Sequence, residues 1–171
     1  MNFKKIIDKA EIAERVKVLS GEINQEYRGE EITVLCVLKG SLLFTADLVR
    51  NIDADLDIEF MRISSYVGTN REEITSLGDL DFKVEGKKIL VVEDIVDSGN
   101  SINFIVNELN KQNPESIKIV TLLYKPDAYN FDMKIDWIGF NIKNDFVVGY
   151  GMDYNQKLRN RKSIYKVITD E

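Results

Sequence analysis

The sequence predicts an α/β fold in which a mostly parallel central sheet is flanked by helices. Short apolar segments rich in β-branched residues alternate along the chain with segments whose apolar residues recur at helical spacing. This alternation is typical of strands joined by right-handed helical crossovers, which make neighbouring strands parallel. Three of the strand-like segments end in polar turns, which are Lys39-Gly40-Ser41, residues 93–101 and Lys125-Pro126-Asp127. Since the carboxyl ends of parallel strands meet at one edge, we expect these turns to share a pocket.

Size and charge limit the classes of protein to consider. The chain has 171 residues, of which 44% are hydrophobic, so we expect a single domain over residues 1–171 with a substantial core. Its net charge of -6 argues against nucleic acid or an anionic membrane as a general partner. The segment Met1 to Ile7 is too short and too charged for a signal peptide, and no apolar run approaches bilayer length. We therefore expect a cytoplasmic protein.

The residue inventory also restricts the chemistry. The sequence contains no histidine, which excludes Ser-His-Asp triads and histidine-ligated zinc and leaves carboxylates, lysine and tyrosine for proton transfer. The single cysteine, Cys36, lies in the apolar run Thr33 to Leu38. We interpret it as a buried structural thiol in a reducing compartment. A reactive thiol is the alternative, but the flanking residues include no group that would lower its pKa.

The first half of the chain alternates helix and strand. Asp8 to Glu11 has the spacing of a capping box, and apolar residues then recur at helical intervals until Gly29. The predicted elements are a helix over about residues 9–28, a strand over 32–38, a helix over 42–49 and a strand over 56–63. The polar segment Ser64 to Glu73 has no clear period. It predicts a long mobile loop of the type that often acts as a lid.

The second half of the chain also alternates predicted strands with a helix, but its last segment has no long helical pattern. The predicted elements are a short strand over 77–82, strands over 89–92, 116–124 and 135–142, and a helix over 102–109. Asn113-Pro114 and Lys125-Pro126 interrupt the chain on either side of one strand. The last segment, from Phe146 onward, is rich in aromatic and basic residues without a long helical pattern. We expect residues of about 142–171, with part of the N-terminus, to form a small hood on the sheet edge.

Three carboxylates follow the strand that is apolar on both faces, Ile89 to Val92. Glu93 and Asp94 are adjacent, so near a low-dielectric sheet edge they repel each other and need a cation, a sugar diol or open water. Asp97 precedes Ser98 to Ser101, which open the next helix, and a helix N-terminus favours phosphate. Mg²⁺ with a polyhydroxylated phosphate ligand fits all of these groups. The alternative is that Asp97 only caps the helix.

These residues resemble a known motif. Val91 to Ser101 is similar to the phosphoribosyl pyrophosphate (PRPP) motif of type I phosphoribosyltransferases, which has two apolar, two acidic and two apolar residues before Asp-Ser/Thr-Gly and a hydroxyl. Ser101 stands where threonine is usual and keeps the hydroxyl. Four further segments occur in the order seen in the hypoxanthine-guanine subfamily, which are residues 38–41, 64–66, 122–126 and 146–154. The resemblance spans about residues 9–168 and includes the family's fold.

The resemblance implies a Mg²⁺-dependent purine-salvage transferase that converts hypoxanthine, guanine or both, with PRPP, to IMP or GMP and pyrophosphate. It implies that Asp97 is the general base at purine N7, and that Glu93 and Asp94 face the ribose hydroxyls and Mg²⁺. The implied 5′-phosphate contacts are Asp97, Ser98, Gly99, Asn100 and Ser101. The implied purine contacts are Lys125, Phe146, Val147 and Asp153, and Asp153 also holds a second Mg²⁺. The implied pyrophosphate contacts are Lys39, Gly40 and Arg159, and the implied lid residues are Ser64, Ser65 and Tyr66.

Several alternatives stay open at this point. Lys39 and Lys125 are also compatible with solvated strand ends, Phe146 with simple packing, and Arg161 competes with Arg159 for pyrophosphate. A PRPP-sensing regulator that binds nucleic acid is a different function for the same fold, although the acidic chain has no basic face in its sequence. A third possible function is transfer of the phosphoribosyl group to adenine or to a pyrimidine. The resemblance further implies a homodimer or homotetramer.

Overall fold

The computed structural model describes residues 2–67, 72–76 and 80–168. It contains a six-stranded sheet in the order β4-β3-β2-β5-β6-β7 and a three-stranded sheet in the order β1-β9-β8. The large sheet comprises β2 (Glu31–Leu38), β3 (Asp55–Val67), β4 (Glu72–Ser76), β5 (Lys88–Val96), β6 (Ser116–Tyr124) and β7 (Trp137–Asn141). All its neighbouring strands are parallel except β3 and β4. The prediction of a mostly parallel α/β sheet is confirmed.

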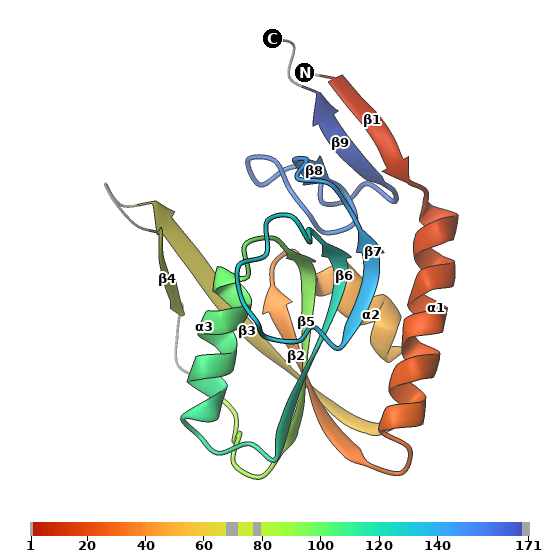
Figure 1. Cartoon of the computed structure of the whole chain (residues 1–171). Coiled ribbons are helices and arrows are strands. Elements are labelled where there is room, and N and C mark those ends of the chain that lie inside the picture. Colours follow the sequence, from red (N-terminus) through yellow and green to blue (C-terminus); the bar gives the residue numbers. More distant parts are fainter. Residues whose placement is uncertain (1, 68–71, 77–79, 169–171) are drawn as a thin grey trace.

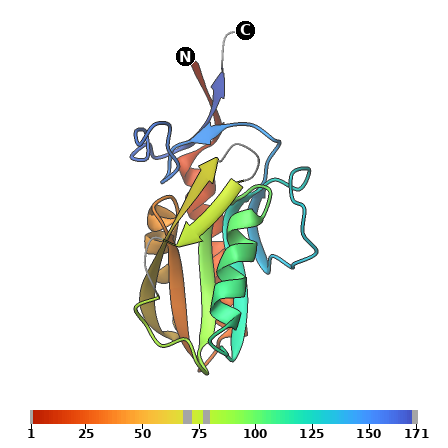
Figure 2. The ribbon, with the colours of Figure 1, turned by 90° about the vertical axis from the view of Figure 1, so that its left-hand side faces the viewer.

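Three helices cover the two faces of this sheet. They are α1 (Lys9–Glu26), α2 (Leu42–Val49) and α3 (Asn100–Asn110), with α1 and α2 on one face and α3 on the other (Figures 1 and 2). Strand β5 is buried on both sides, because Leu90 and Val92 belong to the core under α1 and α2, while Ile89 and Val91 belong to the core under α3. The apolar run at the centre of the sequence is therefore the middle of the sheet.

Helix α1 forms as its sequence predicts. Asp8 Oδ1 accepts a hydrogen bond from the Ala10 amide at 3.0 Å, and Glu11 Oε2 accepts one from the Asp8 amide at 2.8 Å. These reciprocal bonds close the capping box and fix the start of the helix. Its inner stripe, which packs on the sheet, consists of Ile12, Val16, Leu19, Ser20 and Ile23. The helix ends at Glu26, slightly earlier than the predicted residue 28.

A hairpin replaces the predicted loop after residue 63. Strand β3 continues to Val67 and pairs antiparallel with β4, from Ile63 opposite Ser76 to Val67 opposite Glu72. The prediction of an irregular loop was wrong for residues 64–67 and 72–73, because backbone pairing at a sheet edge needs no apolar alternation. Residues 68–71 lie outside the described residues. The short strand predicted over 77–82 was also wrong in its described part, since residues 80–82 form no strand.

The smaller sheet joins segments from the two ends of the sequence. It consists of β1 (Asn2–Ile7), β8 (Val147–Val148) and β9 (Ile164–Ile168), with β9 in the middle. Asn2 lies opposite Ile168 and Lys4 opposite Lys166, so β1 and β9 run antiparallel side by side (Figure 1). This sheet and the loop that joins β8 to β9 lie beyond the carboxyl ends of the parallel strands. We call this unit, residues 2–7 and 146–168, the hood.

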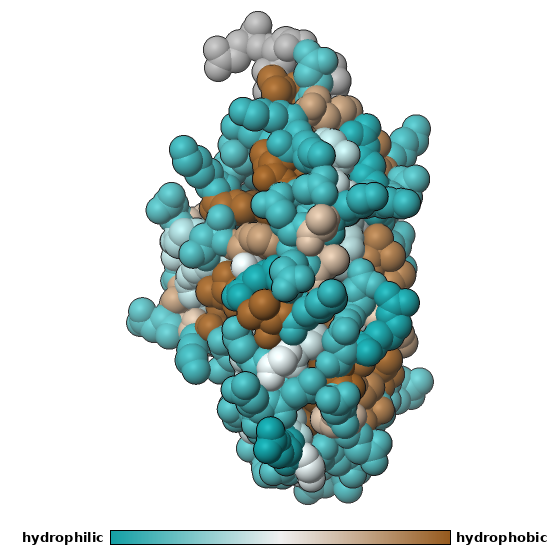
Figure 3. All heavy atoms as spheres, turned by 90° about the vertical axis from the view of Figure 1, so that its right-hand side faces the viewer, coloured by the Kyte–Doolittle hydropathy of each residue, from teal (hydrophilic) through white to brown (hydrophobic). Residues whose placement is uncertain are grey.

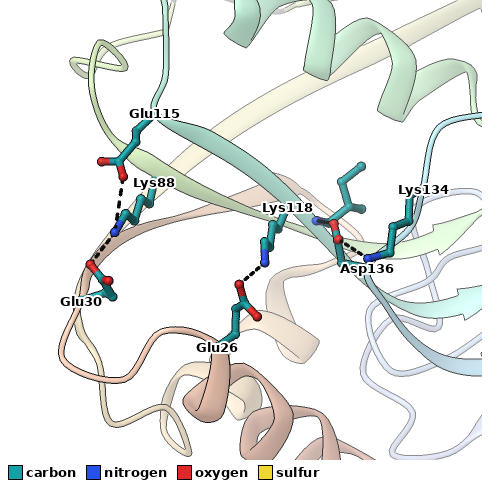
Figure 4. Close-up of polar contacts among 8 residues, drawn as sticks. Glu26, Glu30, Lys88, Glu115, Lys118, Lys134 and Asp136 are labelled. Atoms are coloured by element: carbon teal, nitrogen blue, oxygen red, sulfur yellow. Dashed lines mark hydrogen bonds and ion pairs between the residues drawn. The ribbon is translucent and has the colours of Figure 1, made fainter.

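The opposite edge of the large sheet is lined by ion pairs (Figure 4). Lys88 pairs with Glu30 and also lies 3.5 Å from Glu115, while Lys118 pairs with Glu26. Lys88 and Lys118 therefore have counterions within the protein. On the side of the molecule shown in Figure 3, hydrophilic atoms predominate and apolar atoms form separate small patches. Within the described part of the chain, no helix has both the length and the apolar character needed to span a bilayer.

Two glycine substitutions test this packing. A Cβ on Gly139 in β7 would lie 2.3 Å from the carbonyl oxygen of Leu122, whereas one on Gly21 in α1 would meet nothing within 4 Å. We expect Gly139→Ala to lower the free energy of unfolding by about 1–3 kcal/mol, because the neighbouring strand must move. The matched variant Gly21→Ala should raise it by roughly 0.5–1 kcal/mol, since alanine favours the helix. Urea unfolding followed by circular dichroism measures both. Equal stabilities would contradict the strand packing described.

Candidate active site

The site begins where β5 continues past its last pairing with the neighbouring strand β2. The pairing of β2 with β5 ends at Cys36 and Val92, while β5 remains paired with β6 as far as Val96 and Tyr124. The later part of β5, from Glu93 onward, is therefore not paired with β2 and lies at the carboxyl edge. The backbone of Gly40, in the turn after β2, lies directly against Asp94. Two of the predicted turns thus meet at the edge, as expected.

A cavity of about 490 Å³ lies over the start of α3 and is lined by residues 93–102. Gly99, with a φ of 89°, precedes the first helical residue and occupies the N-cap position. Asp97 is therefore not the helix cap, and the alternative interpretation of it was wrong. The first N–H groups of a helix have no partners within the helix and attract anions. This cavity has the form of a phosphate site, bordered by Ser98, Asn100 and Ser101.

The irregular segment after β6 packs against the loop of residues 98–101. A Cβ on Gly99 would lie 2.5 Å from Cε2 of Tyr129 and 2.8 Å from Cδ2 of Phe131, so only glycine fits. The Asn130 amide donates to the Ser98 carbonyl at 3.1 Å. Sequence reasoning missed Tyr129 and Phe131, because they lie in an irregular segment without periodicity. The glycine of the motif is thus required by both its backbone conformation and its neighbours.

The two adjacent carboxyl groups are poorly solvated. Burial raises the pKa of Glu93 well above its usual value, and the neighbouring charge of Asp94 raises it further. Burial also raises the pKa of Asp94 to about 6, although a hydrogen bond from the Ile95 amide at 3.0 Å and the charge of Arg159 oppose the shift. A Cβ at position 40 would lie 1.8 Å from Asp94 Oδ2. The glycine in this turn therefore lets the backbone approach the acid pair.

A second cavity of about 210 Å³ opens beside the first. Its lining consists of Asp94, Ile95, Asp97, Lys125, Phe146, Val147, Met152 and Asp153. Lys125 is only 7% exposed, and its Nζ lies 2.6 Å from Oδ2 of Asp97. The alternative of a solvated Lys125 was therefore wrong. Phe146 is 55% exposed and meets Tyr154 edge-on at 5.8 Å, so it is not a core residue. The cavity suits a flat ring with polar edges.

The hood loop meets the turn after β2 on the far side of the acid pair. The Leu38–Lys39 peptide bond is cis, and Lys39 Nζ donates to Gln156 Oε1 at 3.2 Å. Arg159 Nη2 donates to the same oxygen at 3.3 Å and lies 2.7 Å from Oδ1 of Asp153. The two cations therefore converge on one point. Gln156 was missed from the sequence, since a polar residue in a loop gives no pattern.

Arg161, the alternative to Arg159 as a pyrophosphate contact, packs against aromatic rings of the hood. Its guanidinium lies 4.4 Å from the ring centre of Phe3 and 4.9 Å from that of Tyr165. These contacts are cation–π interactions with strands β1 and β9 of the hood. Arg159 alone of the pair contacts Asp153 and Gln156. The side chains of the predicted lid residues Ser64, Ser65 and Tyr66 fall outside the described part of the structure, and only their backbone in β3 is described.

The acidic residues suit Mg²⁺ that arrives with a ligand. Over residues 2–67, 72–76 and 80–168, no three His, Cys, Asp or Glu side chains form a preformed metal cage. Mg²⁺ commonly takes one or two carboxylates together with waters and substrate phosphates. Glu93 and Asp94 are oxygen donors with raised pKa values, and the charge of Asp153 adds to the shift of Asp94. A cation here would relieve this repulsion, so the residues fit the ion.

The fold and the site together define a class of enzyme. A cavity at a helix N-terminus suits a phosphate, the buried acid pair suits sugar hydroxyls or Mg²⁺, and the second cavity suits a flat ring, so the site has the form needed to join a phosphorylated sugar to a base. The phosphoribosyl transferase domain family matches residues 3–155 of the sequence. The chain belongs to this family.

Its relatives narrow the family further. The hypoxanthine-guanine phosphoribosyltransferase of Bacillus subtilis is 43% identical over 92% of this chain and 88% of its own. The enzyme of that name from Mycobacterium tuberculosis is 40% identical over 87% of this chain and 78% of its own. A crystal structure of a hypoxanthine-guanine phosphoribosyltransferase from Bacillus anthracis has a TM-score of 0.92, with 38% identity, 96% of this chain and 98% of that one covered.

The shifted pKa of Asp94 predicts a pH dependence. Its folded-state pKa of about 6 exceeds the ordinary 3.8, so the folded protein binds this proton more tightly than the unfolded chain does. The stability that comes from this group is therefore present at low pH and is lost as pH rises through about 6. We expect Asp94→Asn to stabilise the protein in Mg²⁺-free buffer by roughly 2–3 kcal/mol at pH about 8, with a much smaller gain near pH 4.

Urea unfolding at the two pH values measures this difference. Asp132→Asn, the same change at an exposed position away from the cavities, is the matched control and should give no pH-dependent gain. A stabilisation by Asp94→Asn that is equal at both pH values would contradict the burial of the Asp94 charge.

Proposed function

We propose that the protein is a purine-salvage enzyme that converts hypoxanthine, guanine or both, with PRPP, to IMP or GMP and pyrophosphate. The observation that carries this proposal is the 2.6 Å contact between Lys125 and Asp97 inside the flat cavity, next to the phosphate cavity. A 6-oxopurine has a carbonyl oxygen and a ring N–H on one side. Lys125 is a donor for the first and Asp97 an acceptor for the second. The names of the relatives support the same substrates.

The proposed roles on the purine side follow from the cavity lining. The exposed ring of Phe146 stacks on the base, and the backbone of Val147 meets the edge of the ring. Lys125 donates to O6, while Asp97 accepts the N7 proton as N9 bonds to the ribose carbon and the bond from that carbon to pyrophosphate breaks. The Nζ of Lys125 lies 2.6 Å from Oδ2 of Asp97, so the two groups that would contact the purine edge are held side by side.

The proposed contacts to PRPP are made by the other groups at the carboxyl edge of the sheet. The loop Ser98 to Ser101 binds the 5′-phosphate, and Glu93 and Asp94 face the ribose hydroxyls and Mg²⁺. The turn at Lys39 and Gly40, with Arg159, binds pyrophosphate, and Asp153 faces a second Mg²⁺. When bound, Mg²⁺ offsets the charge of the leaving pyrophosphate. We further propose that Ser64, Ser65 and Tyr66 close over the reacting centre and exclude water.

We also propose that the protein assembles as a homodimer or homotetramer in the cytoplasm. Ile58 and Phe60 lie on one face of β3 and are 40% and 53% exposed. Neighbouring apolar side chains of this size on an open strand suit a contact between subunits. Sedimentation equilibrium gives the mass directly, and a monomer at micromolar concentration would contradict the proposed assembly.

The proposed reaction is tested with the purified protein, PRPP, Mg²⁺ and one base at a time. We expect nucleotide and pyrophosphate from hypoxanthine or guanine, and none from adenine or uracil. Chelation of Mg²⁺ should remove the activity, and its readdition should restore it. Absence of a product from every 6-oxopurine, including xanthine, would reject the proposal. Nucleic-acid binding without turnover would favour the regulator instead.

A substitution of the proposed base separates chemistry from binding. We expect Asp97→Asn to lower turnover by about 10²–10⁴-fold, because the amide cannot accept the N7 proton. The affinity for IMP, measured by calorimetry, should change far less, since the phosphate cavity is intact. Asp127→Asn makes the same chemical change at an exposed position in the turn that contains Lys125 and serves as the control. Full turnover in the Asp97 variant would exclude this residue as the base.

A further inference from the structure

A hydrogen bond ties the hood to helix α2. The hydroxyl of Tyr150 donates to Oδ2 of Asp47 at 2.6 Å, between residues 103 positions apart in the sequence. Tyr150 is 8% exposed and has a left-handed φ of 49° between two glycines. Burial, together with the neighbouring Asp47 carboxylate, raises the pKa of Tyr150, so its hydroxyl stays protonated and remains a donor. Asp47 also pairs with Arg50 and is held in place on the helix.

This bond connects the two segments that carry the proposed pyrophosphate contacts. Asp47 belongs to α2, which begins directly after the turn of Lys39 and Gly40. Tyr150 belongs to the turn that leads into Asp153 and Arg159. The Tyr150 and Gly151 amides donate to the carbonyls of Arg161 and Arg159 at 2.8 and 2.9 Å, so the turn moves together with Arg159.

The junction between these segments has no free space. A Cβ on Gly151 would lie 1.9 Å from the carbonyl oxygen of Gly40, and Gly40 in turn lies against Asp94. The side chain of Arg159 also donates to the Gly151 carbonyl at 2.8 Å. The position of the turn on α2 therefore sets the distance between Arg159 and the loop around Gly40.

The two partners of this bond lie outside the proposed ligand contacts. A second side-chain link between the two segments, from Lys39 to Gln156 at 3.2 Å, uses a lysine that would itself bind pyrophosphate. Tyr150 and Asp47 line no part of either cavity at the edge. On the purine side, Val147 is held by the pairing of β8 with β9 and Lys125 lies at the end of β6. Two of the proposed purine contacts, Val147 and Lys125, are therefore held by strands that do not include this bond.

We infer that Tyr150 is a positioning residue for pyrophosphate binding. Its hydrogen bond to Asp47 holds the turn of residues 149–151 against the Lys39–Gly40 loop, so that Arg159 and Lys39 face one pyrophosphate group. The inference rests on the proposed function, because it assigns the residue to the PRPP half of that reaction. It predicts an effect on PRPP that is separate from the effect on the purine.

Kinetics of single and double variants test this inference. We expect Tyr150→Phe to raise the KM for PRPP about fivefold to twentyfold, with the KM for the purine changed less than about twofold. Asp47→Ala should give the same increase, and the double variant no further increase, because both remove one bond. Asp47→Asn keeps an acceptor oxygen and should restore a KM for PRPP close to that of the parent protein.

The control variant is Tyr27→Phe. Tyr27 is also buried, and its hydroxyl has no hydrogen-bond partner among the described residues, so its loss should leave both KM values unchanged. An unchanged KM for PRPP in Tyr150→Phe would overturn the inference. Equal increases in both KM values would also overturn it, since they would indicate a general loss of structure.

Hydrogen exchange supplies a readout that needs no activity. The Gly151 amide should exchange faster in Tyr150→Phe than in the parent protein, because the turn is no longer held on α2. Equal exchange rates would overturn the positioning role. If the parent protein makes no nucleotide, the proposed function fails, yet the exchange measurement still decides whether Tyr150 holds the turn.

Discussion

The close contact of backbone with the acid pair at the end of β5 determines the form of the carboxyl edge. Glu93 and Asp94 are placed there because β5 is buried on both faces and outlasts β2. Their charges lack water, so they require a cation or hydroxyl groups from outside the protein. Gly40 lies against Asp94, and Gly151 lies against the Gly40 carbonyl, which brings two loops to the same point. Each loop then adds a cation, Lys39 from one and Arg159 from the other.

The two edges of the sheet differ in how their charges are balanced. At the amino edge each lysine has a glutamate or aspartate partner within the protein. At the carboxyl edge, neither Glu93 nor Asp94 forms an ion pair with another described residue, and Arg159, whose charge lowers the pKa of Asp94, is already paired with Asp153. Unbalanced charge costs stability in the free protein and is offset when a ligand binds. The carboxyl edge, whose unbalanced charge lowers the stability of the free protein, is thus the edge at which we propose that the substrates bind.

Periodicity and local chemistry were sufficient for much of this structure. The burial of β5, the capping box of α1 and the turn at Gly99 were all predictable, because each depends on residues close together in the sequence. The β3–β4 hairpin was not, since edge pairing uses backbone groups that every residue has. The contact of Tyr129 with Gly99 and the bond from Tyr150 to Asp47 of α2 were not predictable either. Their roles depend on partners that only the fold brings near.

The pairing of β1 with β9 has a consequence for the order in which the molecule forms. Strand β1 (residues 2–7) must wait for β9 (residues 164–168), because no other strand in the described structure pairs with β1. Contacts between such distant segments form late, after the local parallel units. The hood supplies Val147 and Arg159, so a partly made chain would have a folded sheet without a complete pocket. Late protection of β1 amides during refolding would be the corresponding observation. The complete pocket would then arise only once the hood has formed.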